Sequence, residues 1–157
     1  METMALTRST TVQAPRRIML RAGPAAAAQA RCQVQAAIHA WGAPVDVSVA
    51  VLLTSELVTN AIRHQAGETA TLVITCARGQ LRVDVHDTSC AVPVLVDAPG
   101  DAEAGRGLML VASLSTDWGF YRTPEGKVVY FTLAFQADPD QDGDRTKQGD
   151  RSCAAKS

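Results

Sequence analysis

The spacing of hydrophobic positions in the first part of the chain predicts one strand followed by two helices. Residues 16–22 have the composition of a β-strand. Hydrophobic side chains then recur at helical spacing over residues 24–41, and Gly42 offers a stop for that helix. Asp46 suits the N-cap of a second helix, which we expect to continue to about His64.

The second part of the chain predicts two hairpins separated by a loop and a third helix. Residues 69–77 and 81–87 are rich in β-forming residues and are joined by a short turn, so they predict a hairpin. Residues 88–105 contain two prolines and two glycines without a sustained period, which predicts a long loop. We expect a helix to begin at about Arg106 and a last hairpin to cover residues 117–135.

This order of elements predicts an α+β fold. Strands in hairpins, with helices gathered between them, favour a two-layer α/β sandwich in which a mixed, mostly antiparallel sheet carries the helices on one face. Both ends of the chain are polar and have little to bury. We therefore expect one domain over residues 14–136, flanked by disordered tails at residues 1–13 and 137–157.

Composition and charge narrow the classes of partner. The chain is 46% hydrophobic and 20% charged, as in an ordinary soluble globular protein. A net charge of −1 gives no general attraction to nucleic acid or to an anionic membrane. No run approaches the roughly 20 apolar residues that span a bilayer, and the first residues lack the order of a secretion signal. We expect a cytoplasmic protein that binds a small ligand or another protein.

The four cysteines predict free thiols, because they are scattered and form no CxxC pair. A metal site is the weaker hypothesis for the Cys and His residues, since their spacing fits no familiar site. The residues that such a site would use are His64, Cys76, His86 and Cys90.

The second predicted helix carries a carboxylate and an amide one turn apart. Glu56 and Asn60 lie opposite a broad apolar stripe, and Val49 and Leu53 border them. A buried polar group without a partner costs about 1–3 kcal/mol, so such positions normally meet a ligand or a partner. Pairing of Glu56 with Arg63, or exposure to water, is the simpler alternative, and this stretch alone does not separate the two.

Two further features lie at the ends of the predicted loop. Asp87 ends a strand and would direct its carboxylate out from the sheet edge, although an Asp that only initiates a turn is common. Gly105 and Gly107 flank the predicted start of the third helix. Glycines let a backbone approach a ligand closely, and a helix N-terminus suits phosphate. A flexible hinge is the alternative for the two glycines.

Taken in order, these features form a more specific pattern. The segments ELVTNAIRH, VHD, GRGLMLVASLSTDWG and GKVVYF, with a Pro-containing loop after the second, resemble the histidine-kinase-like ATPase (GHKL) superfamily. Within it, the likeness is strongest to the anti-sigma-factor serine kinase group. The resemblance covers about residues 15–135. It implies the GHKL sandwich fold and a site for ATP and Mg²⁺.

The resemblance implies a role for each candidate residue. Asn60 would coordinate the Mg²⁺ that bridges the nucleotide phosphates, Glu56 would act as general base, and Asp87 would accept a hydrogen bond from the adenine amino group. Backbone amides of the second glycine motif would hold phosphate, with the side chain of its arginine reaching either phosphate or solvent. That motif maps to Gly105, Arg106, Gly107 and Leu108.

Two departures from the family pattern affect the expected base pocket. Where fuller members have DxGxG, residues 87–91 read DTSCA, so both glycines are missing. Many members also carry a Thr near the adenine in the last hairpin, and Val128 stands at the position that we take as equivalent.

The resemblance implies an anti-sigma-factor-type serine/threonine kinase in transcription regulation. Its acceptor would be a Ser or Thr on a STAS-type anti-anti-sigma protein, its second partner would be a sigma factor, and relatives that dimerise suggest a homodimer. The alternative is a non-catalytic module that sequesters a partner. Glu56 and Asn60 favour the kinase, whereas the missing glycines and Val128 favour the module.

Overall fold

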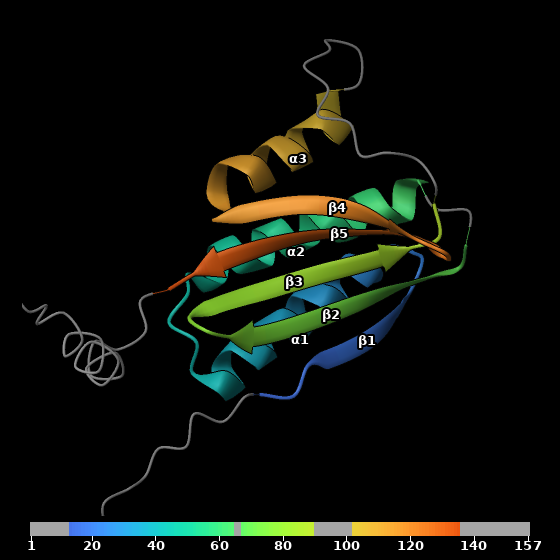
Figure 1. Cartoon of the computed structure of the whole chain (residues 1–157). Coiled ribbons are helices and arrows are strands. Elements are labelled where there is room, and N and C mark those ends of the chain that lie inside the picture. Colours follow the sequence, from blue (N-terminus) through green and yellow to red (C-terminus); the bar gives the residue numbers. More distant parts are fainter. Residues whose placement is uncertain (1–12, 65–66, 90–101, 136–157) are drawn as a thin grey trace, which may run out of the picture.

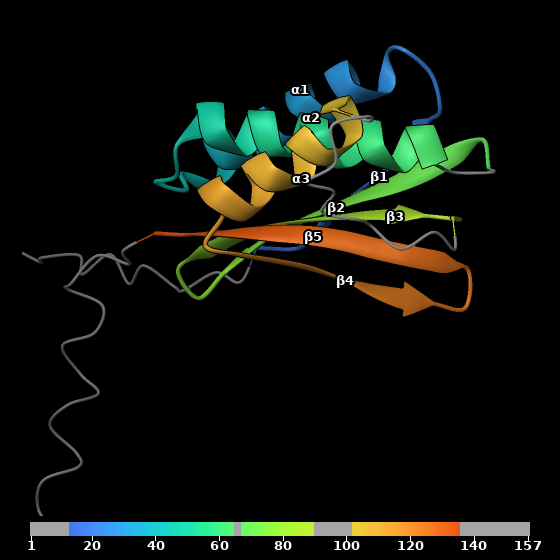
Figure 2. The ribbon, with the colours of Figure 1, turned by 90° about the horizontal axis from the view of Figure 1, so that it is seen from above.

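A sheet and a layer of helices make up the computed structural model, which describes residues 13–64, 67–89 and 102–135. Within these residues, a five-stranded sheet forms one layer and three helices cover one of its faces (Figures 1 and 2). In chain order the elements are β1 (Arg16–Arg21), α1 (Ala26–Trp41), α2 (Val47–His64), β2 (Thr69–Ala77), β3 (Gln80–Asp87), α3 (Ala102–Leu114), β4 (Asp117–Thr123) and β5 (Gly126–Ala134).

The sheet has the order β1-β2-β3-β5-β4, and every neighbouring pair is antiparallel. The predicted α+β class and the placement of the helices on one face are confirmed. The sheet is antiparallel throughout the described strands rather than mixed. The pairs β2–β3 and β4–β5 are hairpins, whereas α1 and α2 connect β1 to β2, and α3 and β4 connect β3 to β5. None of the described helices is long and apolar enough to cross a bilayer.

Alternation along β3 and β5 decides which side chains face the helices. Val83 and Val85 of β3 are directly paired with Phe131 and Val129 of β5, and all four belong to the hydrophobic core. Because side chains two residues apart share a face of a sheet, Asp87 continues this core-facing series at the end of β3. The strand therefore directs its last carboxylate toward the helices.

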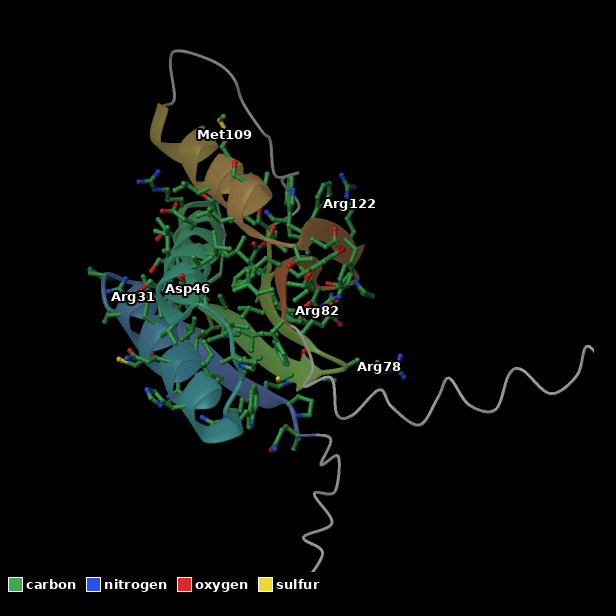
Figure 3. The ribbon with its side chains drawn as sticks, turned by 90° about the vertical axis from the view of Figure 1, so that its left-hand side faces the viewer. Arg31, Asp46, Arg78, Arg82, Met109 and Arg122 are labelled. Atoms are coloured by element: carbon green, nitrogen blue, oxygen red, sulfur yellow. The ribbon has the colours of Figure 1, made fainter. Side chains whose placement is uncertain are left out.

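The second helix, α2, lies between α1 and α3 and packs on the sheet as well (Figure 2). Asp46 caps its start, as predicted: Oδ1 accepts a hydrogen bond from the backbone N–H of Val49 at 3.2 Å (Figure 3). Thr54 is fully buried, and its hydroxyl donates to the carbonyl of Ala50 at 2.7 Å. Leu53, the apolar neighbour expected beside Glu56 and Asn60, is fully buried in the core. Because α2 packs against α1, α3 and the sheet, its buried surface is wider than the single apolar stripe expected from the sequence.

The start of α3 differs from the sequence-based expectation. The helix begins at Ala102, not at about Arg106, so Gly105 and Gly107 lie inside it. Glycine has low helix propensity, so the two glycines favour a later helix start even though the residues just before them favour a helix. Residues 90–101, which hold most of the predicted loop, lie outside the described residues, as do the expected tails.

Candidate functional site

The candidate residues lie on α2, β3 and α3, and the β4–β5 hairpin borders the end of β3. The C-terminal half of α2 carries Glu56 and Asn60, the end of β3 carries Asp87, and the β4–β5 hairpin lies beside that strand end (Figure 1). The helix α3, which carries Gly107, packs against α2. The fold thus places the sequence-predicted motifs on neighbouring elements.

Glu56 and Gly107 are in direct contact between α2 and α3. A Cβ atom built on Gly107 would lie 3.3 Å from Cδ of Glu56 and closer still to its Oε2. Gly107 is buried and Glu56 is half-buried. The absence of a side chain at residue 107 is therefore what leaves space for the carboxylate of Glu56 beside the backbone of α3. This contact joins the helix motif to the second glycine motif.

The second glycine motif lies in α3 rather than before it. In a helix that starts at Ala102, free N–H groups belong to the first turn, and Gly107 lies in the second turn. Leu108 is 3% exposed and belongs to the core. Gly105 lies within the helix, and the side chain of Arg106 lies outside what the structure describes. Phosphate contacts through backbone amides would therefore involve the start of α3 more than Gly107 itself.

Asp87 is buried, and the prediction that its carboxylate projects from the sheet edge is wrong. Its side chain is 0% exposed because it follows the core-facing alternation of β3. Oδ1 accepts a hydrogen bond from the backbone N–H of Ser89 at 2.8 Å. Oδ2 lies 3.5 Å from Nζ of Lys127, whose side chain is 8% exposed. A buried acid thus lies beside a buried ammonium at the end of β3.

Lys127 is a site residue that sequence reasoning missed. It is the direct cross-strand partner of Asp87, whereas Val128 is paired with His86 and lies on the opposite face of the sheet. The residue of the last hairpin that lies beside Asp87 is therefore Lys127, not Val128. The register of β3 on β5 would have revealed it, but a one-residue error in register exchanges the two faces.

Gly67 and Gly126 pack closely against the turn that follows Asp87. A Cβ atom built on Gly67 would lie 2.6 Å from Oγ1 of Thr88, and one built on Gly126 would lie 2.7 Å from Cα of Thr88 and closer to the carbonyl oxygen of Asp87. The glycines that the family pattern expects after Asp87 are absent, and Gly67 and Gly126 instead let two other segments of the chain pack closely against this turn.

The comparison with protein families decides the assignment. Residues 20–133 match the family described as "Histidine kinase-like ATPase domain". This chain belongs to the histidine kinase-like ATPase family. A comparison with functionally curated proteins gave no match.

A solved structure has the same fold as this histidine kinase-like ATPase. The crystal structure of the RsbU and RsbW domains of Rv1364c from Mycobacterium tuberculosis aligns with a TM-score of 0.56 at 21% sequence identity. The alignment covers 80% of this chain and 35% of that one, so this chain spans about a third of the length of its structural neighbour. At this identity the likeness supports the fold alone.

ATP is the ligand that membership of the histidine kinase-like ATPase family implies, usually with Mg²⁺. The described residues fit such a ligand at two points. Gly107 keeps the backbone of α3 free of a side chain beside Glu56, and Asp87 offers a buried acceptor at the strand end. The oxygen-bearing side chains of Glu56 and Asn60 are of the kind that Mg²⁺ prefers.

The open face of the sheet in this histidine kinase-like ATPase holds a separate charged cluster. Nη2 of Arg82 lies 2.7 Å from Oδ1 of Asp84, and the guanidinium stacks over the ring of Tyr130 at 4.0 Å (Figure 3). Burial lowers the pKa of His86 on the same face. Among the described residues, no group of three or more His, Cys, Asp and Glu could hold a metal ion. Cys90, one member of the alternative metal site, lies outside those residues.

Proposed function

We propose that this chain is an anti-sigma-factor-type serine/threonine kinase that uses Mg·ATP. One observation carries the proposal: the carboxylate of Glu56 packs against Gly107, which brings the acid of the helix motif to the glycine motif of α3. This carboxylate lies against α3 shortly after the first turn that we propose for phosphate, and we take it as the base for an incoming hydroxyl. When bound, ATP would supply the phosphoryl group and Mg²⁺ would neutralise its charge.

Each side chain has a part in this proposal. Glu56 accepts the proton of the acceptor hydroxyl, and its half-buried position against α3 limits its alternative orientations. Asn60, one turn later on α2, offers its amide oxygen to the metal ion. Asp87, at the end of β3, accepts a hydrogen bond from the adenine amino group.

The start of α3 would bind the phosphates. Free N–H groups and the positive end of the helix dipole both favour an anion there. Of the residues that the motif suggests for phosphate, Gly105 lies in the first turn of α3 and is the proposed backbone contact, with Arg106 beside it. Gly107 and Leu108 lie in the second turn, and we propose that they support the site through the space that Gly107 leaves for Glu56 and through the core packing of Leu108.

The proposed partners follow from the resemblance of the motifs to the anti-sigma kinase group. The acceptor would be a Ser or Thr on a STAS-type anti-anti-sigma protein, and a sigma factor would be the second partner. Two copies of the chain would form a homodimer, acting in the cytoplasm without direct contact to nucleic acid. A structure that contains an RsbW domain shares the fold that this proposal requires.

A second candidate function is a non-catalytic module that sequesters its partner. The pair of Asp87 and Lys127 favours it, because the ammonium of Lys127 already neutralises the carboxylate that would accept a hydrogen bond from adenine. Such a module would hold its partner whether or not phosphate transfer occurs.

Incubation with labelled ATP separates the two functions. We expect the purified chain to transfer the γ-phosphate of ATP to a STAS-type protein in the presence of Mg²⁺, and the label to disappear when the acceptor Ser or Thr is replaced by Ala. A STAS-type protein that binds the chain tightly but acquires no label would support the sequestering module instead.

Gly107→Ala is expected to slow this transfer at least about tenfold without unfolding the protein. An added methyl group displaces the end of the Glu56 side chain, which can move, and a misplaced base loses much of its effect. Alanine also has a helix propensity about 1 kcal/mol more favourable than glycine. The melting temperature should therefore hold or rise while the initial rate of transfer falls.

The Glu56→Gln background provides the control for Gly107→Ala. If Gly107 acts through Glu56, the substitution should have little further effect once the carboxylate is gone. An equal loss of rate in both backgrounds would show that Gly107 acts independently, and the contact would then have no catalytic meaning.

A further inference from the structure

Lys127 is buried in a position where lysine is uncommon. Its side chain is 8% exposed, and it lies on the helix-facing side of β5, in the row that Val129 and Phe131 continue into the core. Lysine is almost never fully buried unless it is paired. Here the pairing group is the carboxylate of Asp87, at 3.5 Å.

Stability alone does not account for this pair. Removing two charges from water is costly, and replacing a buried ion pair by apolar side chains is often neutral or stabilising. Val129, two residues along the same row, shows that an apolar side chain suits this face of β5. A role in ligand recognition gives the pair a reason to be here.

The pair presents one acceptor and one donor side by side. Oδ1 of Asp87 receives the N–H of Ser89, so Oδ2 is the oxygen that faces the ammonium of Lys127. A carboxylate alone accepts the 6-amino group of adenine and rejects a 6-oxo group, because two acceptors would then face each other. An ammonium beside it can donate to the 6-oxo group of guanine or hypoxanthine, which the carboxylate cannot satisfy.

We propose that Lys127 is a specificity-determining residue that allows this nucleotide site to accept 6-oxopurine nucleotides as well as adenine nucleotides. The inference rests on the proposed function, since it concerns the same site. With a 6-oxopurine, Asp87 accepts from the ring N1–H while Lys127 donates to O6. With adenine, Asp87 accepts from the amino group and Lys127 makes no contact with the base, so Lys127 supports only the 6-oxopurine.

Calorimetric titration of the full chain with Mg·ATP and Mg·GTP tests the proposal through the ratio of the two dissociation constants. In the wild-type chain we expect the dissociation constant for GTP to exceed that for ATP by less than about tenfold. Lys127→Met should raise this ratio at least about tenfold, because it weakens the binding of GTP. Arg122→Met is the matched control. Arg122 is the exposed cross-strand neighbour of Lys127 on β4, and its loss should leave the ratio unchanged.

Thermal melting of each variant shows whether a loss of binding results from unfolding. This control is needed because Lys127→Met removes a cation from beside a buried carboxylate. Should Lys127→Met fail to fold, Lys127→Gln takes its place. Its neutral amide is a weaker donor, so the ratio should still rise several-fold.

Three outcomes would overturn the proposal in distinguishable ways. A wild-type chain that binds ATP but discriminates against GTP by about 100-fold or more refutes the role of Lys127 and leaves the proposed function intact. An unchanged ratio in Lys127→Met does the same. A chain that binds neither nucleotide refutes the proposed function, and this inference with it.

Discussion

Replacement of Glu56 by Gln is expected to slow phosphate transfer to the STAS-type acceptor by about 10²–10⁴-fold. Gln has nearly the same shape as Glu, so it can keep the contact with Gly107 while it loses the ability to take a proton. Nucleotide affinity should stay within about threefold of wild type, since Glu56 is not proposed to bind the base. Single-turnover transfer of labelled phosphate measures the rate, and calorimetry measures the affinity.

Glu68→Gln is the matched control for this substitution. Glu68 is an exposed carboxylate shortly after α2, and its carbonyl oxygen, which the substitution preserves, accepts the N–H of Ala22. Its rate of transfer should equal that of wild type. Transfer by Glu56→Gln at the wild-type rate would remove Glu56 as the base, and equal losses in both variants would indicate a general effect of charge.

Asp87→Asn is expected to weaken the binding of Mg·ATP at least about tenfold, because hydrogen bonds to a charged acceptor are among the strongest in a site. It should also destabilise the fold by about 3–5 kcal/mol, since Lys127 would lose its carboxylate partner at a buried position. Calorimetry gives the affinity, and denaturant unfolding gives the free energy of unfolding.

Asp84→Asn separates these two effects. Asp84 is also buried and also belongs to β3, but it pairs with Arg82 on the opposite face of the sheet. We expect this variant to lose stability and to keep its affinity for ATP. If Asp84→Asn weakens ATP binding as much as Asp87→Asn does, the loss reflects damage to β3 and not the removal of a base contact.

The sequence contains enough to predict the order and type of the elements. Caps at Asp46 and Gly42 act as expected: Asp46 accepts the N–H of Val49, and Gly42 adopts a left-handed conformation with φ 60° at the end of α1. The start of α3 was misplaced, because Gly105 and Gly107 suggested a loop by their local propensity. Packing of α3 against α2 outweighs that preference.

The candidate residues can be named from the sequence, but their contacts cannot. Glu56 and Gly107 were both candidates, yet their contact depends on how α2 crosses α3, which periodicity does not specify. Burial of Asp87 follows from alternation with Val83 and Val85, and Lys127 follows from strand register. Register between β3 and β5 depends on the whole sheet, so the sequence alone does not distinguish Lys127 from the neighbouring Val128.

The most direct test of the account is a calorimetric titration of the wild-type chain with Mg·ATP, repeated without magnesium. The account predicts saturable binding to one site per chain, with an affinity that falls when magnesium is removed and falls again in Asp87→Asn. Absence of binding to the wild-type chain at millimolar nucleotide and magnesium would contradict it.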